Sequence, residues 1–228
     1  GDINNALRYY KKSLGIYEET GNKEGIATSL NNIGIVFHEQ KDIDNALDYY
    51  SQSLEIQQEI GNKYGIANSL DNLGLVYCDK KDYSKAMKYY TDCIKIREEL
   101  KDNNGIARTL GNIGVIYKVQ GDIDKAIEYS NRALKKAQEV GVTETIRDAS
   151  DFLYKAYKQR GEFTKALKMH ELYILMRDSI LNEENTKSLI QQEFQYVYNK
   201  KLASDSIRNA EATMLKDAVI ANHKVQEN

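Results

Sequence analysis

Proline and tryptophan are absent from the 228-residue sequence, and phenylalanine occurs only four times, whereas tyrosine occurs 17 times. Proline interrupts helices more strongly than any other residue, because its ring fixes φ and removes a backbone donor. With no proline and with 41% apolar residues, the chain is expected to be helical from end to end and to form a hydrophobic core.

Cysteine is also scarce. Cys78 and Cys93 are too few for a disulfide framework, which fits a reducing compartment or an oxidising one in which disulfides are not needed. No apolar run approaches the ~18 residues of a transmembrane helix, and no signal peptide begins the sequence. We therefore expect no direct membrane insertion of this segment.

Acidic and basic residues are nearly equal in number. The formal net charge is −2, and no stripe of Lys and Arg stands out. Proteins that bind nucleic acid neutralise phosphates with clustered basic side chains. We therefore expect no nucleic-acid partner.

What the sequence does contain is a period of 40 residues without a single insertion. One column of the repeat is always alanine, namely Ala6, Ala46, Ala86, Ala126 and Ala166. Each unit holds two segments whose apolar residues step by threes and fours, separated by a short connector such as "EQKD". This pattern predicts two antiparallel helices that bury their apolar faces only by stacking on the next pair, which is an α-solenoid.

The predicted boundaries follow from this period. Residues 1–20 have the pattern of a second helix alone, and full repeats cover 21–60, 61–100, 101–140 and 141–180. Residues 181–228 break the period and form a separate C-terminal segment. Because the apolar face of residues 3–20 would be bare, we expect either further repeats before it in a longer protein, or a dimer partner or another segment that covers it.

The spacing within a repeat resembles a known family. Gly34, Phe37, Ala46, Tyr50 and Ser53 follow the order small, aromatic, Ala, aromatic, small that is typical of the tetratricopeptide repeat. The resemblance covers residues 1–180 and is closest to a 40-residue variant of the repeat. It implies an all-α, right-handed superhelix of helix pairs, followed here by a long C-terminal helix. The departures are leucine in place of the usual tryptophan, at Leu30, Leu70 and Leu110, and the absence of a closing proline.

Small residues recur where two helices must come close. Glycines 34, 74 and 114 lie on the predicted buried face of the first helix, and alanines 46, 86 and 126 on that of the second. Glycine inside a helix costs about 1 kcal/mol relative to alanine, so its recurrence indicates a packing requirement. We expect the glycine and alanine columns to let the helix axes approach, while the aromatic residues 37, 77 and 117 fill the space beside them.

The last repeat and the tail depart from the pattern. Ser150, Phe152 and Tyr154 stand where leucine, asparagine and glycine are expected, so the fourth repeat is predicted to meet something other than another repeat. An apolar stripe at residues 190, 194 and 197 is a candidate cap for the array. Beyond residue 203 a thin apolar seam predicts a coiled coil or linker helix, which would support a homodimer, and a solvated helix is the alternative.

The tail also resembles a class of receptors. The stretch "YILMRDSILNEENTKSLIQQEFQY" followed by "KKLASDSIRNAEATMLKDA" is similar to the end of the tetratricopeptide input region of bacterial membrane-bound sensors. In such proteins the output domain is commonly a histidine kinase, a nucleotide cyclase, a phosphatase or a DNA-binding module, none of which is present in this sequence. The resemblance implies a periplasmic location for this segment, and without it a cytoplasmic location stays open.

One asparagine column is the main candidate for binding. Asn32, Asn72 and Asn112 recur on the side of the first helix that lies away from the core. By resemblance, they match the position at which some family members hold the backbone of an extended peptide in the concave groove, since an amide both donates and accepts. The predicted groove residues are Asn32, Asn72, Asn112, Ile35, Leu75, Val115, Thr28, Asn68 and Arg108. The alternative is that the asparagines bond to the helix of an adjacent repeat.

No catalytic, metal or cofactor motif is found. His38, His170 and His223 lack a surrounding pattern of ligands or of a phosphoacceptor, and Cys93 occupies a small-residue core column. The sequence therefore favours a non-enzymatic scaffold that binds a protein or peptide and serves as the input region of a bacterial signalling protein, whose output domain would lie outside this segment. The alternative is a structural module that oligomerises and has no groove ligand.

Overall fold

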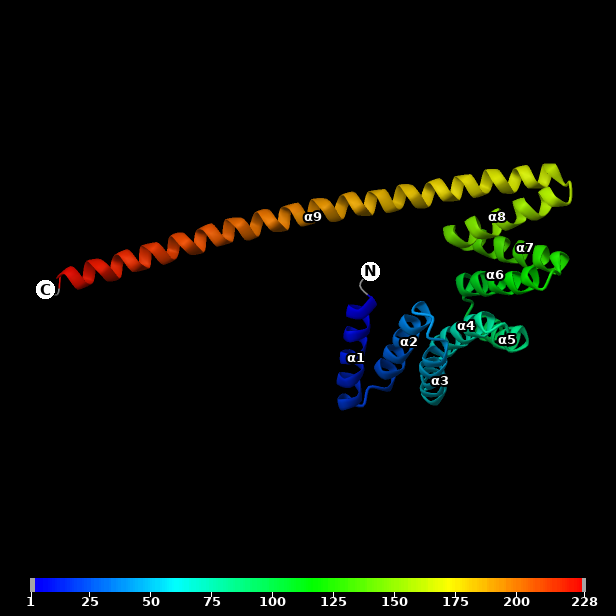
Figure 1. Cartoon of the computed structure of the whole chain (residues 1–228), viewed down its shortest axis with the longest axis horizontal. Coiled ribbons are helices and arrows are strands. Elements are labelled where there is room, and N and C mark those ends of the chain that lie inside the picture. The colour runs from blue at the N-terminus through cyan, green and yellow to red at the C-terminus, as the bar shows by residue number, and fades with distance from the viewer. Residues whose placement is uncertain (1–2, 227–228) are drawn as a thin grey trace. The chain divides into compact units, whose positions relative to one another are not determined.

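The computed structural model describes residues 3–226, apart from the side chains of 196, 197, 203, 207 and 209–226. These residues divide into two units, within 1–177 and 178–228, which are described separately below. All described residues belong to helices or short turns (Figure 1). The helices are α1 (Ile3–Thr20), α2 (Lys23–Glu39), α3 (Ile43–Glu59), α4 (Lys63–Asp79), α5 (Tyr83–Glu99), α6 (Asn103–Val119), α7 (Ile123–Val140), α8 (Thr143–Gln159) and α9 (Phe163–Gln226).

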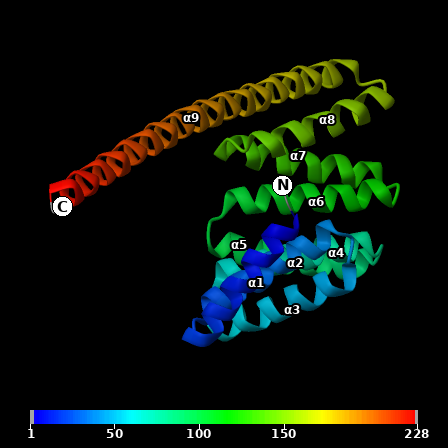
Figure 2. The same ribbon diagram turned by 60° about the vertical axis from the view of Figure 1, so that its left-hand side comes forward.

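The first unit is a stack of antiparallel helix pairs. Helices α2, α4, α6 and α8 are the first helices of the four repeats, and α3, α5, α7 and the beginning of α9 are the second helices. Figure 2 shows α6, α7 and α8 lying side by side, and each helix contacts its sequence neighbour from α1 to α8. The predicted all-α solenoid with a long C-terminal helix is confirmed.

The short connectors are fixed by their polar residues. Each helix from α2 to α7 is capped by an Asn or Asp whose side chain accepts a hydrogen bond from a backbone N–H of the first turn, as Asp42 does from Asn45. The turn before each cap uses a left-handed residue, either glycine or, at 41, 81 and 101, lysine. Helix α8, by contrast, begins without a side-chain cap, because Val142 stands at that position.

The glycine column of the first helix is a point of close approach, and in the first two repeats a tyrosine ring of the second helix fills the space beside it. A Cβ on Gly34 would lie 2.7 Å from the ring of Tyr50, and a Cβ on Gly74 would lie 2.4 Å from the ring of Tyr90. Both rings are buried on the second helix. The glycine therefore makes room for a tyrosine ring, while the alanine column is buried beside it.

The neighbouring aromatic column stacks across each helix pair. The ring centroids of Phe37 and Tyr49 are 5.3 Å apart, and those of Tyr77 and Tyr89 are 5.4 Å apart. The fourth repeat differs: Tyr154 takes the glycine position and His170 takes the tyrosine position. Their ring centroids are 4.5 Å apart, with the rings tilted by 34°. The change at one position is thus matched by a change at the other.

Helix α1 has no fully buried side chain. Ala6, Leu7, Tyr10 and Leu14 are half-buried, and Ile3 is exposed. The face predicted to be bare is therefore only partly covered in the structure.

The second unit contains residues 178–226 of α9. Every described side chain from 181 to 208 is exposed, including Ile190 and Phe194. The side chain of Val197, the seam from 207 to 225 and the side chain of His223 lie outside the described residues. Capping and coiled-coil formation by this segment stay predictions.

Candidate binding surface on the first helices

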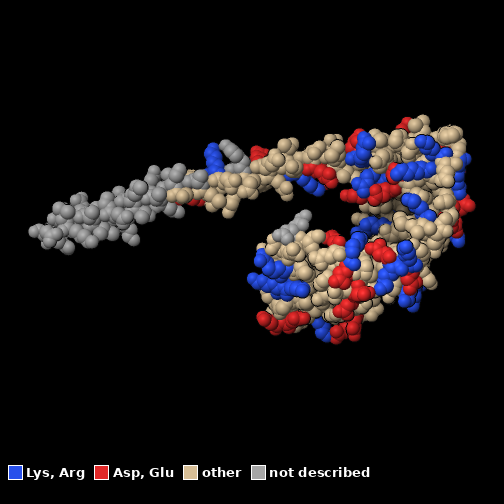
Figure 3. All heavy atoms as spheres, viewed as in Figure 1, with Lys and Arg blue, Asp and Glu red and all other residues tan. Residues whose placement is uncertain are grey.

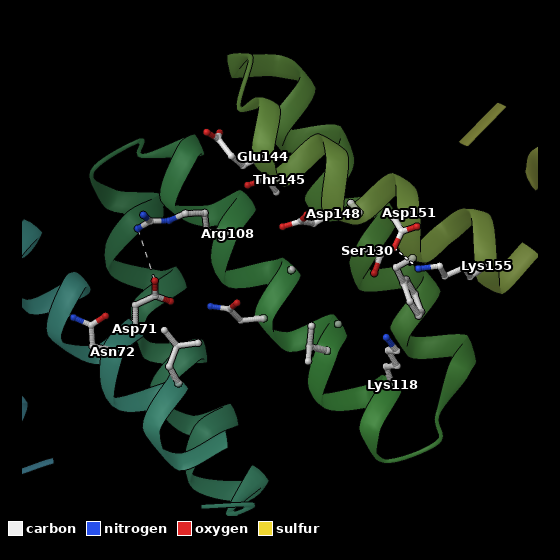
Figure 4. A pocket seen from close by; sticks show the side chains of 17 residues that line it. Asp71, Asn72, Arg108, Lys118, Ser130, Glu144, Thr145, Asp148, Asp151 and Lys155 are labelled. Atoms are coloured by element: carbon white, nitrogen blue, oxygen red, sulfur yellow. Dashed lines mark hydrogen bonds and ion pairs between the residues drawn. The ribbon is translucent and has the colours of Figure 1, made fainter. Parts of the chain in front are cut away.

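The candidate site lies on the surface formed by α4, α6 and α8, where adjacent first helices contact each other (Figure 4). The predicted asparagines meet the preceding repeat along this surface. Asn72 donates from Nδ2 to Oδ1 of Asn31 at 2.9 Å, and Asn112 lies beside Asp71, where its amide lowers the pKa of that carboxyl. The bond of Asn72 is the structural alternative stated above. An amide has further donor and acceptor capacity, so contact with a ligand stays a prediction.

The next step along the surface breaks this pattern and opens a cavity. Phe152 replaces the asparagine, and Gly111 replaces the Asn31 or Asp71 that would be its partner. A Cβ built on Gly111 would meet no atom within 4 Å. Ser130 stands where tyrosine fills the two preceding repeats, and it too borders the open space.

The resulting cavity, called the Gly111 cavity below, has a volume of about 670 Å³. Volumes of 300–1,000 Å³ are typical of ligand sites. Its lining consists of Asp71, Asn72, Leu75, Arg108, Gly111, Asn112, Gly114, Val115, Lys118, Ser130, Glu144, Thr145, Asp148, Ala149, Asp151, Phe152 and Lys155. Figure 4 shows the lining residues around the cavity, which come from α4, α6 and α8 and, for Ser130, from α7.

The cavity combines apolar side chains with charges that are largely paired. Leu75, Val115 and Phe152 are its large apolar members, and Val115 is 57% exposed. Lys155 pairs with Asp151 at 2.6 Å, and Lys118 Nζ lies 5.5 Å from the centroid of the Phe152 ring. A segment with an apolar side chain and a polar backbone suits this lining better than a ligand of strong net charge.

A buried ionic cluster supports one wall of the cavity. The guanidinium of Arg97, 2% exposed, donates from Nη1 to Asp102 at 2.9 Å and lies 3.6 Å from Asp71. Thr109 donates to the other oxygen of Asp71 at 3.0 Å. Burial raises the pKa of Asp71 above its ordinary value, and Arg97 and Arg108 offset that effect only in part.

The structure separates the nine predicted groove residues into three sets. Asn72, Leu75, Arg108, Asn112 and Val115 line the Gly111 cavity. Thr28 and Asn68 line a smaller hollow of about 180 Å³ around Gln57, called the Gln57 pocket below. Asn32 and Ile35 line neither, although Ile35 is 37% exposed.

Sequence reasoning missed Gly111, Asp71 and the contribution of α8. The available signal was the joint change at residues 111 and 152, because the glycine and the phenylalanine both depart from their columns. Residue 31 and its counterparts vary between repeats, and this variation hid their role as partners of the asparagines.

The remaining candidates for chemistry have structural partners. His38 Nε2 lies 2.9 Å from Asp79 of the next repeat, and the His170 ring packs against the ring of Tyr154. Cys93 is fully buried, and burial raises the pKa of its thiol, which disfavours the nucleophilic thiolate. Within the part of the chain that the structure describes, no group of three His, Cys, Asp or Glu is placed to hold a metal, and no helix is long and apolar enough to cross a bilayer. On the face seen in Figure 3, basic and acidic side chains are interspersed over the array.

The sequence matches the tetratricopeptide repeat family over residues 1–59, 26–99 and 65–139. The chain belongs to the tetratricopeptide repeat family. The match indicates no catalytic family, and tetratricopeptide repeats are in general binding scaffolds. No curated protein matches the sequence.

Solved structures share this tetratricopeptide fold. BtubC from P. vanneervenii is 21% identical with a TM-score of 0.65, and the match covers 79% of this chain and 75% of that one. A Rap protein complexed with competence and sporulation factor is 18% identical with a TM-score of 0.59, covering 79% of this chain and 60% of that one. A STAND protein with a tetratricopeptide repeat sensor from Pyrococcus horikoshii is 20% identical with a TM-score of 0.64, covering 80% of this chain and 29% of that one. At these identities the likeness shows the fold.

Proposed function

We propose that this tetratricopeptide repeat chain binds an extended segment of a protein partner across α4, α6 and α8, with an apolar side chain of that segment seated in the Gly111 cavity. The observation that carries the proposal is the interruption of the asparagine column at Phe152 and of the facing polar column at Gly111, which opens about 670 Å³ beside exposed Val115. Apolar walls with a few convergent polar groups are typical of binding sites.

The asparagines of this surface supply the polar part of the proposed contact. Asn72 and Asn112 border the cavity, and an amide side chain can both donate and accept hydrogen bonds. A bound backbone would use that capacity regardless of the side chains it carries, while Leu75, Val115 and Phe152 would select the apolar one.

We further propose that this binding is the input step of a bacterial signalling protein. Support comes from the resemblance of the tail to sensor input regions and from two structural neighbours. One is the Rap protein complexed with competence and sporulation factor, and the other is the signal transduction ATPase with a tetratricopeptide repeat sensor. The periplasmic side of a membrane is the location that the tail resemblance favours.

The test uses a substitution that fills the cavity without disturbing the fold. Gly111→Met places its side chain where a Cβ meets no atom within 4 Å. Gly15→Met is the matched control, because Gly15 is also helical with no atom near its Cβ, and it lies on α1 away from the cavity. Peptides selected from a random display library on the wild-type protein would be titrated against both variants.

We expect Gly111→Met to weaken the selected peptides at least about tenfold, a loss of ~1.4 kcal/mol, while Gly15→Met binds like wild type. Equal binding by both variants would place the ligand elsewhere and reject the proposal.

A structural oligomerisation module is the second candidate, favoured by the exposure of Leu189, Phe194 and Tyr198 on α9. Apolar side chains exposed along one helix are commonly covered by a partner. Sedimentation equilibrium of wild type and of a Leu189→Glu/Phe194→Glu variant decides it. A dimer lost in the variant, with no peptide binding to wild type, would favour this candidate over the first.

A further inference from the structure

The Gln57 pocket is a second site, separate from the Gly111 cavity. It lies where α3 meets α2 and α4, and its lining consists of Thr28, Asn31, Ser53, Gln57, Asn62, Tyr64, Gly65, Asn68 and Ser69. None of these side chains carries a formal charge. Its volume of about 180 Å³ is well above the ~10–15 Å³ needed to hold one water molecule.

The next repeat shows what fills the equivalent space. Forty residues on, Gln57 becomes Arg97, and its guanidinium occupies the hollow, donating to Asp102 and to Asn68 Oδ1 at 3.2 Å. In the pocket, Asn31 and Asn62 replace the two carboxylates, Asp71 and Asp102. The chain has exchanged the cation and both of its acidic partners together, keeping side chains of similar shape without the charges.

Gln57 is left with an unmet bonding need. The residue is 4% exposed, and its Oε1 is buried with no hydrogen-bond partner among the described residues. A buried acceptor without a partner is destabilising, so a rotation of the Gln57 amide that brings Oε1 into the pocket to meet a donating occupant would be favourable.

Other oxygens of the pocket are held by partners. Asn62 Oδ1 accepts from the backbone N–H of Gly65 at 3.1 Å, and Asn31 Oδ1 accepts from Asn72 at 2.9 Å. Those bonds fix the amide oxygens, and each retains a second lone pair. The wall therefore offers both lone pairs and the N–H groups of the same amides, which a group that both donates and accepts can use.

We propose that the Gln57 pocket binds an uncharged primary carboxamide, the side-chain group of glutamine or asparagine in a protein segment. A carboxamide is planar like the guanidinium that fills the adjacent site, and its N–H groups would donate to Gln57 Oε1 and to the asparagine oxygens. A guanidinium or ammonium would be buried here without a carboxylate, which is strongly unfavourable. The proposal does not rest on binding at the Gly111 cavity.

The test is an NMR titration of the whole chain, read at the side-chain amide signals of Gln57, Asn31 and Asn62. The probes are three capped tripeptides, acetyl-Ala-Xaa-Ala-N-methylamide, in which Xaa is glutamine, arginine or norleucine. Free L-glutamine is a fourth probe, which separates a protein-borne carboxamide from the amino acid. We expect saturable shifts with the glutamine tripeptide and at least about tenfold weaker binding of the arginine and norleucine tripeptides.

Two variants tie the signal to the pocket. The triple variant Gln57→Arg/Asn31→Asp/Asn62→Asp imports the residues of the next repeat, so it should fold, fill the pocket and lose glutamine binding. Gln58→Arg adds the same side chain at the exposed neighbouring position of α3 and should bind like wild type. Binding that survives in the triple variant, arginine binding as tight as glutamine binding, or no saturable shift with any probe, meaning a pocket that holds water only, would each overturn the proposal.

Discussion

The guanidinium of Arg97 occupies the space that Gly105 leaves by lacking a side chain: a Cβ on Gly105 would lie 1.4 Å from Arg97 Nη1. The same pairing occurs at Tyr17 with Gly25 and at Gln57 with Gly65. In the following repeat both members change, to Ala137 and Thr145. Where a second helix carries a large residue near its end, the first helix of the next repeat has glycine at the facing position. Where the second helix carries alanine there, the facing position is threonine.

This pairing predicts unequal costs for the same substitution. Gly105→Ala must displace Arg97 and Asp102 and is expected to lower the unfolding free energy by about 1–3 kcal/mol. Gly65→Ala should cost less, because only the end of Gln57 must move and its Oε1 has no hydrogen bond to break. Urea unfolding of both variants measures the difference. In an Arg97→Ala background the cost of Gly105→Ala should fall, and an unchanged cost there would show that the two residues are not coupled.

The glycine that faces Tyr50 should be less replaceable than its counterpart in the third repeat. Gly34→Ala has to move a buried ring that would lie 2.7 Å from the new Cβ, and we expect a loss of about 1–3 kcal/mol. Gly114→Ala meets Ser130 Oγ at 3.0 Å, which requires a shift of a few tenths of an ångström. The gain of about 1 kcal/mol from replacing a helical glycine should leave Gly114→Ala near neutral. Thermal unfolding compares the stability of the two variants. Equal losses of stability would show that the contact with Tyr50 does not determine the cost of Gly34→Ala.

Asp71 should make stability depend on pH in a defined direction. Burial raises its pKa in the folded state, so the folded protein retains a proton that the unfolded chain loses near its ordinary value of 3.8. The contribution of Asp71 is therefore fully present below that pH and is lost as pH rises through the folded-state pKa. We expect the unfolding free energy of wild type, relative to Asp71→Asn, to decrease over this range in urea unfolding at a series of pH values. A difference that stays constant, or that increases with pH, would contradict the raised pKa.

The left-handed lysines predict a stabilising change. Lys81 has φ of 61°, at a turn position where Gly61 and Gly121 stand in other connectors. Lys81→Gly should relieve about 1 kcal/mol of strain, whereas Gly121→Ala, at φ of 82°, should cost a similar amount. Differential scanning calorimetry should show shifts of opposite sign. Shifts of the same sign would show that these turns are set by other contacts.

The fold was predictable because the sequence pattern that specifies a helix pair recurs several times. A buried alanine column and the polar caps at residues 42, 82 and 122 recur at the same spacing, so each observation of the pattern supports the others. Periodicity also placed Asn72 and Asn112 on the surface away from the core, where the structure has them. It could not name their partners, because Asn31 and Asp71 belong to a column that varies.

The candidate sites arise where repeats differ, whereas a periodic pattern captures only the residues that the repeats have in common. Ser130 in place of tyrosine and Gly111 in place of a polar residue each remove volume, and only the packed structure shows that both losses border one cavity. The Gln57 pocket has the same origin, since a side chain shorter than Arg97 leaves the space unfilled. Contacts between residues about 40 positions apart decide these sites.

The paired exchanges between neighbouring repeats also encode the order of the array. If residues 61–100 were duplicated in tandem, Arg97 would meet the Asn62 of the copied repeat in place of Asp102, and it would lose its closest carboxylate. At the copied boundary, the buried guanidinium of Arg97 would thus keep only one of its two carboxylate partners. A chain of this kind cannot grow by simple copying of one unit, and each added repeat has to be adjusted to the neighbour it follows.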